Sequence, residues 1–391
     1  MSANTSLAPK ALLDLIAFAG PAGVTPDALE RQFPESSRST INRRLAALVT
    51  EGAIKPVGSG RAVRYQVASP FTIAAIEQYL ALDPQARPLV SFDQTLLQPT
   101  PGIDPDKAVR LQGLNGLAGP LDKKFLSNFL IDFSWGSSVL EGGTYSDLDT
   151  QALLLYGERN PDKPMEDALL ILNHKSAIEH LWEHRDLTVA NICAMQSMLT
   201  DQHGIAEVMD SDHFLPVEQR GIAREYADVN LQRSAYLPPS RPGTGYIEKA
   251  LNEIVDIAKT LHPVESAFYL MTRIPYLQPF ANGNKRTARL AANLPLLSNG
   301  LLPISFVDFN RARYIQGMAA FYELGSPQIM EGVFVNGYVR SIFRGSQLPA
   351  SIRVTGFDID AGVSKLASYV QTGTFPKDAF ATAFVGSPKR G

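Results

Sequence analysis

The sequence predicts a mainly α-helical protein with a small α+β domain at its N-terminus. From about Leu121 onward, apolar residues recur at helical spacing in one segment after another. The clearest strand-like alternation lies in the first 70 residues, for example at Val63, Tyr65 and Val67. Of the 391 residues, 45% are hydrophobic and 19% charged, which excludes a mostly disordered chain and predicts two or three domains.

The first 70 residues predict three helices followed by a two-stranded hairpin. Residues 12–18 form an apolar first helix. Thr25, followed by a proline, caps a short second helix, and Ser39-Thr40 opens a third. Residues 53–57 and 63–67 are expected to be the two strands, joined by a glycine-rich turn.

This order of elements resembles a winged helix-turn-helix domain, which implies DNA binding through the third helix and the hairpin. The candidate DNA-binding residues are Arg38, Asn42, Arg43, Arg44, Arg61 and Arg64. Residues 1–70 carry a net charge of +3 and the remainder −6, so the basic segment is expected to have its own partner. A winged helix used for protein contact or homodimerisation is the alternative.

The rest of the chain divides into three parts. Residues 71–115 are rich in proline and predict a short helix over 73–82 followed by an extended linker arm. Residues 116–345 form a helical body, and 346–391 a C-terminal extension with one helix near 362–369. The helices expected in the body cover residues 122–135, 165–182, 188–199, 246–261, 264–274, 284–298, 310–322 and 328–343, with a short hairpin around 217–236.

Several classes of protein and site are excluded. No segment is apolar over the roughly 18 residues that a membrane helix needs, and no signal peptide is recognised, so we expect a cytoplasmic protein. The single cysteine, Cys193, rules out an intramolecular disulfide and is expected to be a buried thiol. His180 and His184 fit the H-x-x-E-H zinc pattern, but without a third ligand we prefer a helix end and expect no metal there.

The densest group of chemically competent side chains follows a helix that ends before Pro279. A turn of small residues comes next, and a new helix begins near Asn284. Backbone N–H groups at such a helix start attract anions. Lys285, Arg286 and Arg289 add three cations where the helix dipole disfavours them, which indicates an anionic ligand such as a phosphate.

The segment QPFANGNKRTAR, residues 278–289, resembles the signature of the Fic (Fido) family, H-P-F-x-[D/E]-G-N-G-R-x-x-R. The resemblance covers roughly residues 116–345. It implies an all-helical domain that binds Mg-ATP and most often transfers AMP to a hydroxyl of a target protein.

Two further segments resemble parts of the same family. Ser137, Glu141 and Gly142 fit its inhibitory motif, [S/T]-x-x-x-E-[G/N], and residues 221–239 resemble the flap that holds a target protein. The resemblance implies a phosphate nest lined by Gly283, Asn284 and Lys285, with Arg286 on a phosphate. Arg289 would hold the γ-phosphate or pair with Glu141, which then acts as a latch by removing the phosphate's partner.

Three positions depart from the signature. Gln278 stands at the catalytic histidine, and an amide does not take up a proton near neutral pH; losing a general base typically costs about 10²–10⁴ in rate. Asn282 replaces the Mg²⁺-holding carboxylate by a weaker neutral ligand. Lys285 replaces a glycine, as in the related Doc branch, whose members resemble kinases. His203 or His213 could supply a substitute base, although a surface histidine without such a role is the simpler interpretation.

Two functions fit these residues. The first is an ATP-binding, autoinhibited regulator with a DNA-binding domain and impaired AMP transfer. The second is an active enzyme with an unconventional base that transfers AMP or phosphate, or removes AMP, at a target protein held by the flap.

Overall fold

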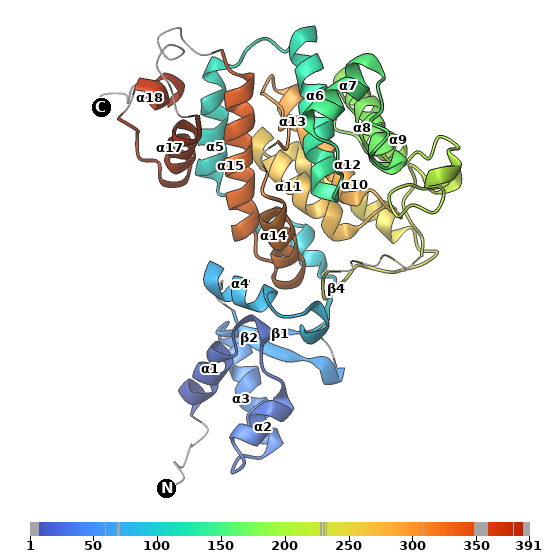
Figure 1. The fold of residues 1–391 in the computed structure, drawn as a ribbon. Coiled ribbons are helices and arrows are strands. Elements are labelled where there is room, and N and C mark those ends of the chain that lie inside the picture. Colours follow the sequence, from blue (N-terminus) through green and yellow to red (C-terminus); the bar gives the residue numbers. More distant parts are fainter. Residues whose placement is uncertain are drawn as a thin grey trace. The chain divides into compact units, whose positions relative to one another are not determined.

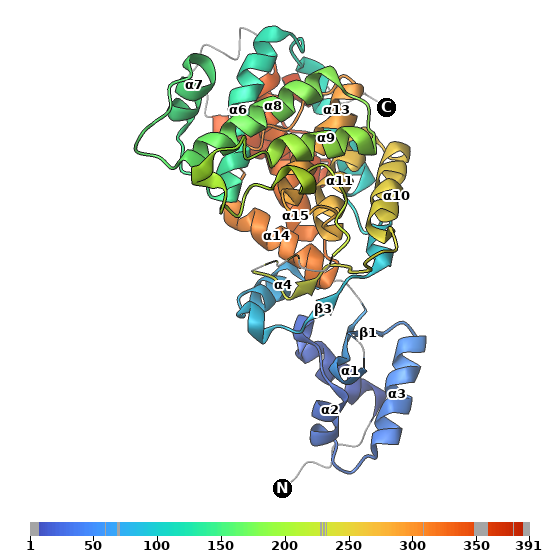
Figure 2. The same cartoon turned by 90° about the vertical axis from the view of Figure 1, so that its right-hand side faces the viewer.

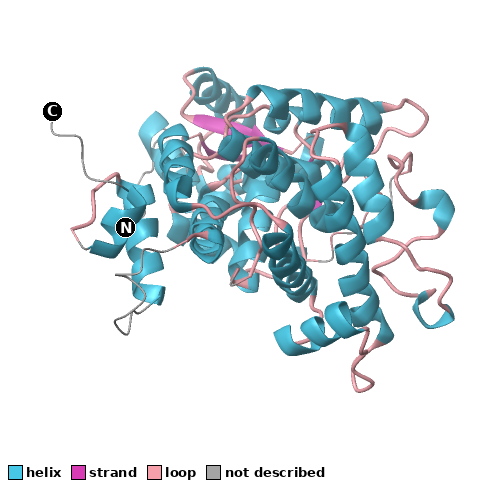
Figure 3. Cartoon of the chain, turned by 90° about the horizontal axis from the view of Figure 1, so that it is seen from above, coloured by secondary structure: helices cyan, strands magenta, loops and turns pink. Residues whose placement is uncertain are grey.

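The structure is a computed structural model in which helices predominate (Figures 1 and 3). It describes residues 8–58, 60–68, 71–226, 229, 231, 233–307, 309–347, 359–377 and 379–385. These residues form two compact units. The first contains residues up to Phe92 with Asn230–Leu237 and Gln316–Ile329; the second contains Asp93–Val229, Pro238–Ile315 and the residues from Met330 onward.

The first unit begins with the three expected helices and the hairpin. Helices α1 (Pro9–Phe18), α2 (Pro26–Gln32) and α3 (Arg38–Thr50) precede strands β1 (Ile54–Val57) and β2 (Arg64–Val67), which pair antiparallel. Their shared core consists of Leu12, Ile16, Val24, Leu29, Phe33, Ile41, Leu45, Leu48 and Ile54.

The caps of α2 and α3 explain where these helices start. The Thr25 hydroxyl accepts the N–H of Ala28, as expected. Helix α3 starts earlier than expected: Ser37, and not Ser39 or Thr40, is its cap, and its hydroxyl accepts the N–H of Thr40.

The expected extended arm is wrong. After helix α4 (Ile73–Leu80), residues 84–117 contain three 3₁₀ turns, strand β3 (Val90–Ser91) and helix α5 (Pro105–Gly113). Two of the prolines start helical turns: Pro84 and Pro105 occupy first helical positions behind the aspartate caps Asp83 and Asp104.

The expected hairpin around 217–236 is also wrong. In the described part of this segment, strand β4 (Tyr236–Leu237) pairs in parallel with the distant β3, with Val90 opposite Tyr236. A two-residue parallel pairing has no local turn signal, so the sequence could not indicate it.

A buried carboxylate joins three segments of the first unit. The side chain of Glu323, on α14 (Arg311–Leu324), is fully buried. Its Oε1 accepts from Arg87 Nη1 at 2.9 Å, and its Oε2 accepts from the Tyr79 hydroxyl at 2.9 Å. Ser234 Oγ and the N–H of Ala235 also donate to Oε1, at 2.8 and 3.1 Å. Both carboxylate oxygens are therefore satisfied without water.

The second unit is the helical body. Its first helices are α6 (Lys123–Glu141), α7 (Asp147–Tyr156), α8 (Met165–Glu183) and α9 (Val189–Leu199). They are followed by α10 (Tyr246–Thr260), α11 (Pro263–Leu277), α12 (Asn284–Ala291), α13 (Asn293–Ser298) and α15 (Gln328–Gly345). Helices α6, α8 and α9 pack in succession, and α9 contacts α12 (Figures 1 and 2). Helix α11 contacts α5, α10, α12 and α13, and its residues from Ser266 to Leu277 are all buried.

Most helices expected in the body are confirmed, with three differences. Helix α6 runs six residues further than expected, to Glu141. The expected helix 284–298 is two helices that meet at Ala292. Helix α7 was not expected, because its apolar residues Leu148 and Tyr156 are exposed and give no amphipathic pattern.

The C-terminal extension contributes α17 (Ile359–Thr372), which confirms the helix expected near 362–369, and α18 (Ala379–Val385). In the part of the chain that the structure describes, every helix is too short or too polar to cross a membrane.

Replacing Glu323 by alanine should destabilise the first unit strongly. The variant leaves Arg87 as a buried charge without its carboxylate, which typically costs about 3–5 kcal/mol of unfolding free energy. Denaturant unfolding measures this. Arg38→Ala, which breaks an exposed ion pair, is the control and should unfold like the unmodified chain. A Glu323→Ala variant as stable as this control would contradict the structural role of the carboxylate.

Candidate nucleotide-binding site

The signature segment forms a tight turn between α11 and α12. Gln278 ends α11 with left-handed backbone angles, φ 51° and ψ 60°. Gly283 precedes α12 with φ 76°, and a Cβ there would lie 2.8 Å from Cγ2 of Thr200. Glycine is required at this position for both reasons. The first N–H groups of α12 have no partner within the helix, as at any helix start.

The Gln278 side chain is buried and makes its hydrogen bonds within this turn. It is only 3% exposed. Its Nε2 donates to the Pro275 carbonyl at 2.7 Å, and its Oε1 accepts from Asn284 Nδ2 at 2.8 Å. Asn284 in turn accepts the N–H of Phe280 at 2.9 Å. Gln278 and Asn284 therefore brace the turn from within.

Asn282 does not fit a magnesium ligand in this arrangement. Its Oδ1 accepts the N–H of Gly283 at 2.5 Å and lies 3.5 Å from Nη2 of Arg286, while its Nδ2 donates to the Asp212 carbonyl. The side chain's one oxygen is thus committed to the turn, and residues 278–289 contain no carboxylate. Among the described residues, no group of three or more His, Cys, Asp and Glu side chains could hold a metal ion.

Arg286 is buried and binds main-chain carbonyls. Its Nη1 donates to Leu199 at 2.9 Å and its Nη2 to His213 at 2.5 Å. Burial lowers the pKa of Arg286 to about 10, so the guanidinium stays charged at neutral pH. The side chain ties α12 to the end of α9 and to the 211–214 turn.

Arg289 brings the two family motifs together. Its side chain is completely buried, and its Nη2 donates to Glu141 Oε1 at 2.7 Å. Its Nε donates to the Ser137 hydroxyl at 2.9 Å. Ser137 and Glu141 lie one turn apart on α6, so the extension of α6 beyond its expected end is what points both at Arg289. Gly142 then ends α6 with φ 105°.

Lys285 provides a second cation for Glu141. Its Nζ lies 3.8 Å from Glu141 Oε2. Burial alone would raise the pKa of Glu141, but the charges of Lys285, Arg289 and Arg286 outweigh burial and hold that pKa below its usual range. The carboxylate is therefore ionised throughout the physiological pH range.

Sequence reasoning missed a buried histidine behind this pair. His174 Nδ1 lies 2.6 Å from the Leu170 carbonyl and must donate to it, so Nε2 accepts the Ser137 hydroxyl proton at 2.8 Å. The Ser137 oxygen is then free to accept from Arg289. Burial, followed by the charges of Arg286 and Arg289, lowers the pKa of His174 to about 3, so the ring is neutral.

Arg224 and Gln196 connect the flap segment to the signature turn. Arg224 Nε donates to the Gln278 carbonyl at 2.6 Å, and its Nη2 donates to Pro239 at the other end of the flap at 2.8 Å. Gln196, on α9, accepts the N–H of Gly221 at 2.5 Å and donates to the Asn282 carbonyl at 3.0 Å. Nothing local in the sequence marks either role.

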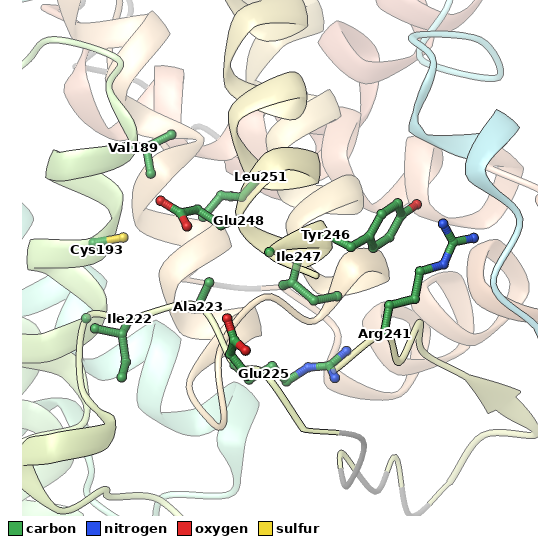
Figure 4. A pocket seen from close by; sticks show the side chains of 13 residues that line it. Val189, Cys193, Ile222, Ala223, Glu225, Arg241, Tyr246, Ile247, Glu248 and Leu251 are labelled. Atoms are coloured by element: carbon green, nitrogen blue, oxygen red, sulfur yellow. The ribbon is translucent and has the colours of Figure 1, made fainter. Parts of the chain in front are cut away.

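A cavity of about 240 Å³ lies beside the flap segment (Figure 4). It is lined by residues 221–225, by the start of α10 and by Cys193 on α9. At its edge, the guanidinium of Arg241 lies over the ring of Tyr246 at 4.2 Å. Cys193 is half-buried and not fully buried as expected, and burial raises its pKa to about 11. Its thiol is therefore uncharged.

The candidate DNA-binding residues differ in their surroundings. Arg38 is paired with Asp27 and Glu30, at 2.5 and 2.9 Å, so its charge is compensated within the first unit.

The other five are placed as follows. Asn42 and Arg43 are exposed on α3, and Arg44 is half-buried. Arg64 is half-buried on β2 and donates to a main-chain carbonyl at 3.4 Å. The side chain of Arg61 lies outside the described residues.

The two histidines of the zinc pattern stack on each other at the end of α8. The ring centroids of His180 and His184 lie 4.3 Å apart, and the Nδ1 of His184 lies 3.1 Å from the His180 carbonyl. This is the helix-end arrangement that the sequence favoured.

Comparison with family models finds a match within the body. The model described as Fic/DOC family matches residues 186–296, which include α9 to α12, the flap segment and the signature turn. The chain therefore carries a Fic/DOC family domain, and its mainly helical architecture is that expected for the family.

Individual relatives are distant. "Protein adenylyltransferase fic-1" from Caenorhabditis elegans is 26% identical over 186 residues, which are 45% of this chain and 33% of that protein. The match thus spans about a third of the relative's length. A solved structure titled "Fic-1 (aa134 - 508) from C. elegans" is 21% identical with a TM-score of 0.46, covering 61% of this chain and 70% of that one. A Fic family protein from Desulfovibrio desulfuricans is 17% identical with a TM-score of 0.48, covering 71% and 89%.

The buried His174 should make stability depend on pH. An unfolded histidine takes up a proton near pH 6.5, but the folded ring does so only near pH 3, so stability is lost as pH falls below about 6.5. Between pH 7 and pH 5 the loss from this residue is about 2 kcal/mol. Denaturant unfolding at both pH values should give a smaller loss in His174→Gln than in the unmodified chain.

His203→Asn is the control, since His203 is exposed. Equal pH dependence in His174→Gln and in the unmodified chain would contradict the prediction.

Proposed function

We propose that the body is an autoinhibited nucleotide-binding domain that takes the triphosphate of ATP at the start of α12, in competition with Glu141. The observation that carries this proposal is the buried pair of Arg289 and Glu141, 2.7 Å apart. A carboxylate delivered by another helix is the anion that this cationic helix start requires when no phosphate is bound. Release of Glu141 would expose Arg289 and Lys285 to a phosphate.

The position of Gln278 supports impaired AMP transfer. Its amide binds Pro275 and Asn284 within the turn and has no basic atom. A target hydroxyl that reaches this position meets no group that takes its proton. We therefore propose nucleotide binding, and not AMP transfer through Gln278, as the body's primary property.

The dependence of nucleotide binding on Mg²⁺ should differ from that implied by the family signature. Since the Asn282 oxygen is engaged by Gly283, the proposed affinity comes from Arg289, Lys285 and the N–H groups of α12. Any divalent cation would have to be held chiefly by the nucleotide itself.

The first unit is proposed to bind DNA as a winged helix. Three helices and a hairpin with a positive net charge support this assignment. Arg43 is its best candidate contact, because it is exposed on α3, whereas Arg38 is already paired with Asp27 and Glu30. ATP binding in the body would then make the protein a nucleotide-responsive regulator.

The bracing of the flap favours a second candidate, an active enzyme. Arg224 and Gln196 fix the flap to the signature turn, as a site that positions a target protein would need. The test incubates purified Glu141→Ala protein in cell lysate with ATP labelled at the α or the γ phosphate. Labelled protein from α-label alone indicates AMP transfer, and from γ-label alone phosphate transfer. Label at neither position, with ATP binding retained, would exclude transfer of AMP or of phosphate.

Replacing Glu141 by alanine should strengthen ATP binding at least tenfold, about 1.4 kcal/mol, because ATP no longer displaces the carboxylate from Arg289. Isothermal titration calorimetry measures the affinity. Excess EDTA should weaken binding by less than threefold, since Asn282 offers no free oxygen. Glu179→Ala, an exposed glutamate on α8, is the control. Equal ATP affinity in Glu141→Ala and the control would contradict competition at Arg289.

Arg43→Ala should reduce DNA affinity and lower the slope of log K against log salt by about 0.9, the value for one lost phosphate contact. Arg38→Ala is the matched control on the same helix and should change the slope less, because Arg38 is paired with Asp27 and Glu30. Fluorescence anisotropy with a labelled duplex at several salt concentrations measures both. A larger effect from Arg38 would contradict this assignment of the contact surface.

A further inference from the structure

A histidine lies against the signature turn. The Arg286 guanidinium donates to the His213 carbonyl at 2.5 Å, and Asn282 donates to the carbonyl of the adjacent Asp212. The 211–214 turn is therefore bound through its main chain to the segment that begins α12. These contacts hold the main chain of His213 beside the start of α12.

Glu166 faces the ring from the first turn of α8. Its Oε1 lies 3.7 Å from His213 Nε2 and also accepts the Ser211 hydroxyl. The Ser211 hydroxyl oxygen accepts the N–H of His213 at 3.0 Å, which holds the turn in place. A carboxylate near Nε2 favours the tautomer with its proton there, so the Nδ1 lone pair is the available acceptor. The side chains of His213 and Glu166 are 29% and 36% exposed, so water reaches both.

Charges from three helices act on this ring. Burial, and then the positive charge of Arg286 on α12, lower the pKa of His213. Glu166 and Asp167 on α8 and Glu141 on α6 act in the opposite direction but do not reverse the shift. The ring is neutral at pH 7, as a proton acceptor must be.

Of the six histidines in the chain, His213 combines a partly exposed side chain with a main-chain carbonyl that is bound by the signature segment. His174 is completely buried, and both its ring nitrogens are engaged. The remaining four contact groups outside residues 278–289: His180, His184, His203 and His262.

We propose that His213 is the general base of this nucleotide site and that it activates water against a phosphorus of bound ATP. The inference rests on the proposed ATP binding and adds a slow hydrolytic activity to it. Glu166 is a positioning residue that orients the ring. Gln278, whose amide is committed to the turn, takes no part in the proton transfer.

The step balances with water as the only co-reactant. Nδ1 of His213 takes a proton from water while the water oxygen forms a bond to phosphorus. The bond from that phosphorus to the bridging oxygen breaks, and its electron pair leaves with the departing phosphate or nucleotide. The imidazolium then returns its proton to the leaving group or to solvent. Once the products leave, Glu141 pairs with Arg289 again, so hydrolysis would reset the autoinhibited state.

The test uses the full chain with Glu141→Ala and ATP in ¹⁸O-labelled water. Release of ADP with labelled phosphate indicates attack at the γ phosphorus. Release of AMP and pyrophosphate indicates attack at the α phosphorus if AMP carries the label, and at the β phosphorus if pyrophosphate carries it. Adding His213→Asn should slow the reaction by about 10²–10⁴, the usual contribution of a general base. His184→Asn, a change at an exposed histidine at the end of α8, is the control and should leave the rate unchanged.

A pH profile separates a positioning role of Glu166 from a structural one. The rate should rise with pH as His213 loses its proton. Because Glu166 raises the pKa of His213, Glu166→Gln should move this rise to lower pH as well as reduce the maximal rate. Proton NMR of the His213 ring, assigned by comparison with His213→Asn, should show the same shift without any turnover.

Calorimetry of ATP binding in every variant distinguishes failure of the proposed ATP binding from failure of the proposed role of His213. Absence of ATP binding in Glu141→Ala would contradict the proposed function itself. ATP binding without hydrolysis, or hydrolysis that His213→Asn does not slow, would overturn the role of His213 alone.

Discussion

The site depends on one interaction, the buried ion pair between Arg289 and Glu141. Arg286 and Arg289 are both buried on the short helix α12, where they repel each other, and Arg286 also opposes the helix dipole in the first turn. A carboxylate from α6 offsets this charge at 2.7 Å. The helix start therefore always needs an anion, and the fold supplies one from within. A phosphate ligand would take over a place that the protein has already built.

Arg286 and Arg289 bind different kinds of partner. Arg286 binds the carbonyls of Leu199 and His213 and so holds the surrounding segments together. Arg289 binds a side chain from another helix, and its orientation is set by Ser137 and, behind it, by neutral His174. In the proposed function, a phosphate replaces this second kind of contact.

The three departures from the family signature have structural consequences. Gln278 braces the turn through Pro275 and Asn284, Asn282 ties it to the 211–214 turn, and Lys285 adds a second cation beside Glu141. Gln278 and Asn282 replace groups suited to chemistry by ones that stabilise the turn, and Lys285 replaces a glycine by a cation beside the carboxylate. In the proposed mechanism, the proton acceptor is His213 on the neighbouring 211–214 turn and not a residue of the signature segment.

The sequence alone determined the helices with clear apolar periodicity, the Thr25 cap and the concentration of cations at the start of α12, because these depend on neighbouring residues. It identified Glu141 as a partner of Arg289 only through the family resemblance. Only the tertiary structure shows the features that depend on long-range contacts, such as the parallel pairing of β3 with β4 and the bracing of the flap by Arg224. It also decided the placement of His213 beside Arg286. Hydrogen bonds between segments 50 or more residues apart leave no periodicity or spacing in the sequence, so only the packed chain reveals them.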